Sequence, residues 1–206
     1  MQFRPSTINC TSRASPSEGF PKGRLPTGRS WELLLRSPNQ TDRLGRAIGQ
    51  SLRGGETLAS FGPLGAGKTT LVRGIAVGLD APAISVSSPT FVFIHEYRGR
   101  LLLAHVDLYR LNSTQELQSI GLDEHLCGTT VVVVEWADKG LSILPGERLE
   151  IELQHRTVRS RRVRISATGP ASSALLTQIK QRYAPSLRRA PSHRLTASKF
   201  RKKASS

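Results

Sequence analysis

A glycine-rich stretch, GPLGAGKT, combines residue types that bind phosphate at a spacing that suits this chemistry. It fits the pattern G-x-x-x-x-G-K-[ST] from Gly62 to Thr69. In such a loop the backbone N–H groups turn inward around a phosphate, the lysine places a positive charge at the β- and γ-phosphates, and the next hydroxyl ligates Mg²⁺. Glycines allow positive φ and a close approach of the backbone to the phosphate. The stretch therefore predicts a nucleotide-binding site that contains Lys68.

The flanks distinguish this loop from an ordinary glycine-rich turn before a helix. Upstream, ETLASF (56–61) is typical of a short buried strand. Downstream, Leu71, Ile75 and Leu79 recur every four residues and predict one buried helix face. Strand, loop and helix in this order are the context that the motif requires, and the helix N-terminus adds partial positive charge for the phosphate.

A phosphate loop needs a second anchor for its metal, commonly an acid at the end of a nearby buried strand. Asp107 follows the apolar run LLLAHV, and Glu135 follows VVVV. Each could instead be a surface acid at a strand end, but a carboxylate directly after so apolar a run favours a functional role. The pattern leaves open which of the two ligates the ion. His105 is expected to be packed or hydrogen-bonded rather than to act as a base.

Two further residues have more than one interpretation. Thr90, in the proline-bounded segment SSPTF, either senses Mg²⁺ and the γ-phosphate, as a hydroxyl of a switch loop does, or simply begins a strand. Trp136, beside Glu135, either belongs to the core or covers a nucleotide or a partner. The residues alone decide neither case.

The elements that must position these residues alternate between strands and helices. Thr41 is expected to cap a helix that runs to Arg53, and the run TTVVVVEW is expected to form a central strand buried on both faces. A hairpin is expected around Arg98–Arg100, and a helical segment is expected to break at Gly121. The other predicted elements are strands at 31–36, 149–155 and 161–167 and a closing helix at 171–183. Together they predict an α/β fold, a P-loop NTPase-like layered sheet with mixed parallel and antiparallel strands.

The charge is distributed unevenly along the chain. The 206 residues carry a net charge of +15, with +4 on residues 1–30, −3 on residues 31–155 and +14 on residues 156–206. We expect one domain, residues 31–183, between a disordered N-terminal extension (1–30) and a disordered basic tail (184–206). The extension is rich in arginine and nearly free of acids, which a transit peptide or a start codon placed too early would also explain.

Other features of the composition restrict the class of protein. Hydrophobic residues make up 37% of the chain, which is enough for one modest core, and no run approaches the ~18 apolar residues of a membrane span. Cys10 and Cys127 lie far apart and lack the spacing of metal ligands. Reduced thiols and a cytoplasmic location are therefore expected.

The order of the motifs GPLGAGKTT, SSPTF, HVDLYRL, ELQSIGLDEHL, VEWADKG and a late LP resembles the TsaE family. The resemblance covers residues 31–168, and the combination is far more specific than the phosphate loop alone. It implies a compact P-loop ATPase that uses ATP and Mg²⁺. It also implies work with the partner proteins TsaB and TsaD to place a threonylcarbamoyl group on N6 of adenosine 37, in tRNAs that read ANN codons. In this family ATP hydrolysis is thought to reset the complex between turnovers, so contact with tRNA would be indirect.

The resemblance also assigns roles to individual residues. It implies that Thr69 and Glu135 bind Mg²⁺ and that Asp107 helps to orient the metal or the attacking water. It favours Thr90 as a switch-like threonine, and Trp136 matches the tryptophan that follows the glutamate. The residues assigned to the nucleotide are Gly65, Ala66, Gly67, Lys68, Thr69, Thr70 and Trp136.

Two further parts of the chain bear on nucleotide binding. Residues 37–41 fall where relatives approach the adenine ring. The second loop position, usually acidic in the family, is Pro63, which has no N–H to donate. Because the donors nearest the phosphates come later in the loop, we expect nucleotide binding to survive.

Two other classes of function compete with this interpretation. A small-molecule or nucleoside kinase uses the same loop but needs an acceptor pocket, usually with an arginine-rich lid, and residues 121–131 contain no arginine. An RNA-binding adaptor would act through the basic tails and would still bind RNA after the phosphate loop is destroyed. The basic tails also have a simpler explanation, which is that they only keep the protein in solution.

Overall fold

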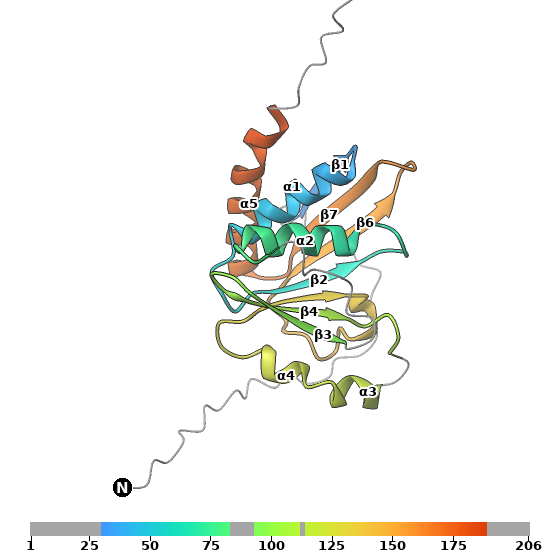
Figure 1. The fold of residues 1–206 in the computed structure, drawn as a ribbon, viewed down its shortest axis with the longest axis vertical. Helices are drawn as coiled ribbons and strands as arrows, with labels where there is room; N and C mark the ends of the chain where they lie inside the picture. The colour runs from blue at the N-terminus through green and yellow to red at the C-terminus, as the bar shows by residue number, and fades with distance from the viewer. Residues whose placement is uncertain (1–29, 83–92, 112–113, 189–206) are drawn as a thin grey trace, which may run out of the picture.

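The computed structural model describes residues 30–82, 93–111 and 114–188. These residues form a mixed sheet of seven strands with helices on both faces (Figure 1). The predicted α/β layered sheet is therefore confirmed. No helix in the described ranges is long and apolar enough to span a membrane. The extension expected at 1–30 lies outside the described residues apart from Ser30. The segment that contains Thr90 and residues 189–206 of the tail expected at 184–206 also lie outside them.

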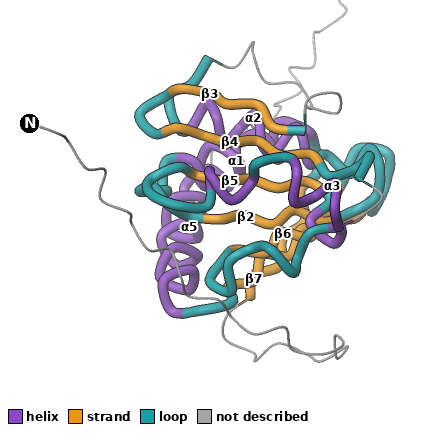
Figure 2. The backbone as a smooth tube through the Cα atoms, turned by 90° about the horizontal axis from the view of Figure 1, so that it is seen from below, coloured by secondary structure: helices purple, strands orange, loops and turns teal. Residues whose placement is uncertain are grey.

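The strands follow the order β1-β7-β6-β2-β5-β4-β3, and Figure 2 shows most of them side by side. Three neighbouring pairs are parallel, namely β6 with β2, β2 with β5, and β5 with β4. The pairs β1 with β7, β7 with β6, and β4 with β3 are antiparallel. The strands are β1 (Ser30–Leu35), β2 (Thr57–Phe61), β3 (Ile94–Arg98), β4 (Leu102–Asp107), β5 (Val131–Glu135), β6 (Leu149–His155) and β7 (Arg161–Ala167).

Each face of the sheet has its own apolar core. Helices α1 (Pro38–Gly49), α2 (Lys68–Gly78) and α5 (Pro170–Arg188) cover one face. The short helices α3 (Thr114–Ser119) and α4 (Leu122–His125) and the 3-10 turn η2 (Ala137–Lys139) cover the other. Alternate valines of β5 enter the two cores, which confirms the prediction of a strand buried on both faces.

Helices α1 and α2 touch through glycines, so that their backbones lie close together. A Cβ added at Gly45 would lie 2.4 Å from the carbonyl oxygen of Leu71, and one added at Gly74 would lie 2.4 Å from that of Asp42. Gly49 and Gly78 face the partner helix in the same way one turn later. Because α2 begins in the phosphate loop, this close crossing also holds the start of α1 beside the loop.

Two predicted helix boundaries are wrong, for local reasons. Ser37, not Thr41, caps α1: its side chain accepts a hydrogen bond from the N–H of Gln40, and proline occupies the first turn, where no N–H is needed. The helix ends at Gly49 rather than at Arg53, because the backbone tightens there: the N–H groups of Ser51 and Leu52 donate to the carbonyls three residues back, those of Ile48 and Gly49.

Other local predictions agree with the structure, with one exception. The hairpin of β3 and β4 is present, and Gly121 separates α3 from α4 with a φ of 72°. Helix α5, however, continues to Arg188, five residues beyond the end predicted for the closing helix at residue 183.

Candidate functional site

The carboxyl ends of β2, β5 and β4 lie next to one another, and the predicted chemical groups follow them. Ser60 of β2 is in register with Glu135 of β5, which is in register with Asp107 of β4. The phosphate loop leaves β2 at this edge, the usual place for ligands in α/β sheets. A cavity of about 380 Å³ lies there. It is lined by Leu64, Gly65, Gly67, Lys68, Thr69, Thr70, Asp107, Tyr109, Glu135 and Trp136.

The structure thus brings together all the predicted site residues except two. Thr90 lies outside the described residues, so its role stays a prediction. Ala66 belongs to the loop but is fully buried and does not line the cavity.

The shape of the loop depends on its glycines. Gly62 has a φ of 134°, and a Cβ there would lie 2.1 Å from the carbonyl oxygen of Leu153 in the neighbouring strand β6. Gly67, directly before α2, has a φ of 102°. Side chains are unfavourable at both positions, so the residue pattern and the backbone geometry agree.

Lys68 is buried and lies folded back onto its own loop. Its Nζ donates to the carbonyl oxygens of Gly62 at 2.7 Å and Pro63 at 3.0 Å, and it lies 3.8 Å from the centroid of the Trp136 ring. Burial lowers the pKa of Lys68, while the negative charges of Glu135 and other nearby acids oppose that shift. A phosphate that entered the cavity would offer the ammonium group stronger, charged acceptors than these carbonyls.

A chain of hydrogen bonds, partly buried at Thr69 and fully buried at His105, links Thr69, Glu135 and His105. The Thr69 hydroxyl donates to Oε2 of Glu135 at 3.2 Å, and Nε2 of His105 lies 2.9 Å from Oε1. His105 and Glu135 are both almost fully buried, which confirms the packed, hydrogen-bonded histidine expected at this position. The other ring nitrogen of His105, Nδ1, has no hydrogen-bond partner among the described residues. The histidine is therefore oriented by its contact with Glu135.

The hydroxyl oxygen of Thr69 and the carboxylate oxygens of Glu135 are ligands that fit Mg²⁺. This ion prefers oxygen ligands and is commonly held by one or two carboxylates together with substrate phosphates and waters. Within the described ranges no group of three or more His, Cys, Asp or Glu side chains is arranged to hold a metal alone. Thr69 contacts Glu135 directly, whereas Oδ1 of Asp107 accepts a hydrogen bond from the N–H of Tyr109 at 2.9 Å. Of the two acids, Glu135 is the one shown in contact with the loop hydroxyl.

Trp136 lies at the cavity, and it adopts a backbone conformation that bulky residues rarely take. Its φ is 58° and its ψ is 42°, in the left-handed region. The centroid of its ring lies 4.9 Å from that of Tyr109, and Nζ of Lys139 donates a hydrogen bond to the backbone carbonyl of Tyr109. A strained residue held in place by its neighbours is typical of functional sites. Trp136 packs against the core on this face of the sheet and also lines the cavity.

A smaller cavity of about 80 Å³ adjoins the phosphate loop on the side of α1. Its lining includes Pro38 and Thr41, so part of the 37–41 segment lies beside the loop, and its predicted adenine contact stays a prediction. Arg159 and Arg161 complete this lining. Sequence reasoning missed both arginines because they occur in a run of basic residues that looked like general surface charge.

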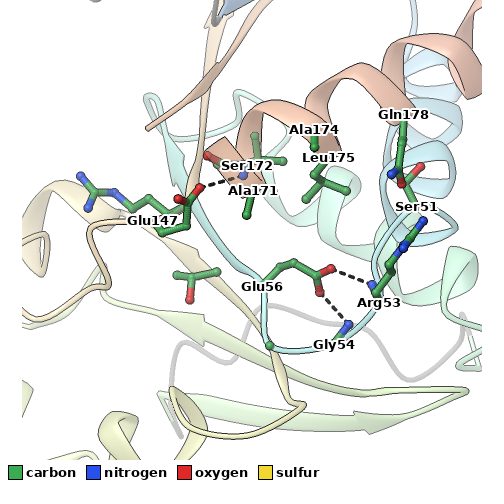
Figure 3. A pocket seen from close by; sticks show the side chains of 14 residues that line it. Ser51, Arg53, Gly54, Glu56, Glu147, Ala171, Ser172, Ala174, Leu175 and Gln178 are labelled. Atoms are coloured by element: carbon green, nitrogen blue, oxygen red, sulfur yellow. Dashed lines mark hydrogen bonds between the residues drawn. The ribbon is translucent and has the colours of Figure 1, made fainter. Parts of the chain in front are cut away.

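A hollow of about 400 Å³ lies at the opposite end of the sheet, where β2 and β6 begin (Figure 3). Its two carboxylates already hold backbone groups. Glu56 accepts from the N–H groups of Arg53 and Gly54, and Glu147 accepts from that of Ser172 at the start of α5. These acids stabilise a turn and a helix end, so we assign no chemistry to this hollow.

Comparisons with known proteins agree with the motif order. The family model described as Threonylcarbamoyl adenosine biosynthesis protein TsaE matches residues 35–163, more than half of the chain. The tRNA threonylcarbamoyladenosine biosynthesis protein TsaE of Treponema pallidum is 40% identical over 121 residues, 59% of this chain and 89% of that protein. The Bacillus subtilis protein of the same name is 36% identical over 146 residues, 70% of this chain and 90% of that protein. The crystal structure of Bacillus subtilis YdiB is similar with a TM-score of 0.63 and 30% identity, covering 74% of this chain and 95% of that one. The chain belongs to the TsaE family of tRNA threonylcarbamoyladenosine biosynthesis proteins.

Proposed function

We propose that this protein binds ATP with Mg²⁺ at the carboxyl ends of β2 and β5 and hydrolyses it. The observation that carries the proposal is the contact between Thr69 and Glu135 at 3.2 Å, directly beside the glycine loop and Lys68. A hydroxyl from the loop and an acid from the adjacent strand are the pair that holds Mg²⁺ in P-loop NTPases.

Each residue has a role that follows from its position. The loop N–H groups bind the phosphates, and Lys68 moves from the Gly62 and Pro63 carbonyls to phosphate oxygens, where its charge stabilises the transition state. Thr69 and Glu135 hold Mg²⁺, which when bound neutralises charge that develops on the phosphates. Asp107, which lines the cavity at the end of β4, orients the attacking water in this proposal. Trp136, which lines the cavity beside Glu135, covers the bound nucleotide.

We further propose that hydrolysis serves N6-threonylcarbamoylation of adenosine 37 in tRNAs that read ANN codons. Family membership supports this assignment, and the roles of TsaB and TsaD as partners follow from the resemblance. In this scheme ATP turnover resets the partner complex, and tRNA meets this protein only through that complex. The cytoplasmic location expected from the sequence stays a prediction.

Reconstitution tests the proposal. The purified protein is mixed with TsaB, TsaD, an ANN-reading tRNA and the threonylcarbamoyl donor, and ATP hydrolysis and modified adenosine are measured together. Both should appear with the wild-type protein, and both should be lost with Lys68→Ala. Phosphorylation of a small molecule or nucleoside in place of water-dependent hydrolysis would contradict the proposal and favour the kinase alternative.

A further inference from the structure

One arginine of β7 reaches across to the phosphate loop and binds its backbone. Nε of Arg161 donates to the carbonyl oxygen of Ala66 at 3.0 Å, and Nη2 donates to that of Gly65 at 3.3 Å. Its third nitrogen, Nη1, donates to the carbonyl oxygens of Thr157, Val158 and Ser160 at 3.1 to 3.2 Å. A single side chain therefore connects the β6–β7 turn to two consecutive peptide groups of the loop.

These contacts fix the direction of the loop N–H groups. In a planar trans peptide the C=O and the following N–H point to opposite sides. With the Gly65 carbonyl bound to Arg161, the N–H of Ala66 turns the other way and donates to the carbonyl of Pro63 at 3.2 Å. With the Ala66 carbonyl bound, the N–H of Gly67 also points away from Arg161. Gly67 lines both the cavity of about 380 Å³ and the smaller cavity that Arg161 lines.

The turn that carries this arginine is itself well supported. The N–H groups of Arg156 and Thr157 both donate to the carbonyl of Ser160, and the Thr157 and Ser160 hydroxyls lie 2.7 Å apart. Next to it, Nε2 of His155 lies 3.2 Å from the carbonyl oxygen of Leu64. Carbonyls of three consecutive loop residues, 64 to 66, thus face the end of the β6–β7 hairpin.

We propose that Arg161 is a positioning residue that holds the phosphate loop in its nucleotide-ready shape before the nucleotide arrives. The inference rests on the proposed function, because it concerns the same loop. A loop N–H group whose direction is already set, as that of Gly67 is by the bound Ala66 carbonyl, needs less ordering when a phosphate binds, so affinity rises. The guanidinium has five donors in a rigid fork and contacts the loop and the turn together, which a lysine ammonium cannot do.

The test compares three full-length variants: Arg161→Met, Arg161→Lys and, as the matched control, Arg164→Met. Arg164 lies three residues along the same strand and pairs with Glu32 at 2.8 Å instead of with the loop. Two quantities are measured. One is amide hydrogen exchange of peptides covering residues 62–70 without nucleotide, and the other is the Kd for ADP, with and without Mg²⁺. Thermal melting without nucleotide shows whether each variant is folded.

Both Arg161 variants should speed exchange in the loop and raise the Kd for ADP about tenfold, by analogy with the loss of metal affinity when a hydrogen-bond partner of a metal ligand is removed. The loss should be the same with and without Mg²⁺, because Arg161 does not touch the metal-binding residues. Arg164→Met should change neither quantity. Full recovery with Arg161→Lys would show that charge alone matters and would overturn the proposal, as would normal loop exchange in Arg161→Met. If the wild-type protein itself fails to bind ADP, the proposed function fails, while the exchange measurement still decides whether Arg161 orders the loop.

Discussion

Lys68 has two sets of partners, the loop carbonyls and Trp136 that it contacts here and the phosphates that it is proposed to contact during the reaction. Lys68→Ala removes the charge that would stabilise the transition state and should reduce ATP hydrolysis to background. A phosphate-release assay with saturating ATP measures this. Trp31→Phe, on the edge strand β1, is a suitable control and should retain turnover. Normal turnover by Lys68→Ala would contradict the proposal that this loop binds the phosphates of ATP.

The two acids at the strand ends should differ in their response to substitution. Thr69→Ala and Glu135→Ala should each weaken Mg²⁺-dependent nucleotide binding, because these two side chains form the oxygen pair beside the loop. Asp107→Asn should leave binding intact and slow hydrolysis. Calorimetric titration of ADP with and without Mg²⁺, beside single-turnover hydrolysis, separates the two effects. Loss of the Mg²⁺ dependence in Asp107→Asn but not in Glu135→Ala would reverse the roles.

The buried position of Lys68 predicts a pH effect on stability. Burial lowers its folded pKa below the ordinary 10.5, so between that lowered value and 10.5 the unfolded chain holds a proton that the folded chain has released. Stability contributed by this group therefore rises with pH across that window, and below it the folded state carries a constant cost. Urea unfolding of the wild type and of Lys68→Met measures this. The advantage of Lys68→Met should shrink as the pH approaches 10.5, and a constant difference would contradict the lowered pKa.

At the scale of elements, the contact between α1 and α2 depends on the absence of side chains. In Gly74→Ala the new methyl would lie 2.4 Å from the Asp42 carbonyl and 3.0 Å from Cα of Gly45. Alanine favours a helix by about 1 kcal/mol over glycine, but separating two packed helices costs about 1 to 3 kcal/mol. We therefore expect a net loss of stability in urea unfolding. Gly146→Ala, where a methyl meets nothing within 4 Å, is the control and should be close to neutral.

The elements also show which features a sequence reveals and which it does not. The order of strands and helices, the loop and both acids were predictable because each depends on a local pattern: an apolar period, a glycine spacing, or an acid after a valine run. The cap at Ser37 was missed because Thr41 also fits the N-cap preference, and the proline that decides between them was not weighed. Arg161 was missed because its partners lie about 95 residues away in sequence and only the sheet order brings them together.

At the scale of the whole molecule, most of the positive charge of the C-terminal third lies in two groups, one on each side of Lys180, Arg182 and Arg188 of helix α5. Five arginines lie on β7 and the turn before it, in the described part of the chain, and some of them adjoin the phosphate loop. They are Arg156, Arg159, Arg161, Arg162 and Arg164. Six more basic residues and no acid follow from residue 189 onward. The two groups can be separated experimentally, because helix α5 ends between them at Arg188.

Removal of residues 189–206 should leave ATP hydrolysis unchanged, because no predicted site residue lies there and Tyr183, a fully buried side chain of α5, is retained. If the tail attracts tRNA phosphates, each contact releases a counterion, and log affinity should fall with log salt by about 0.7 to 0.9 per contact. Truncation would then weaken tRNA binding at low salt and reduce that slope, as filter binding over a salt series can show. We favour the plainer outcome, an unchanged slope and a tail that only aids solubility, because a run of like charges alone does not specify a partner. A reduced slope would contradict that preference, whereas a loss of ATP hydrolysis would mean that the tail contacts the folded domain.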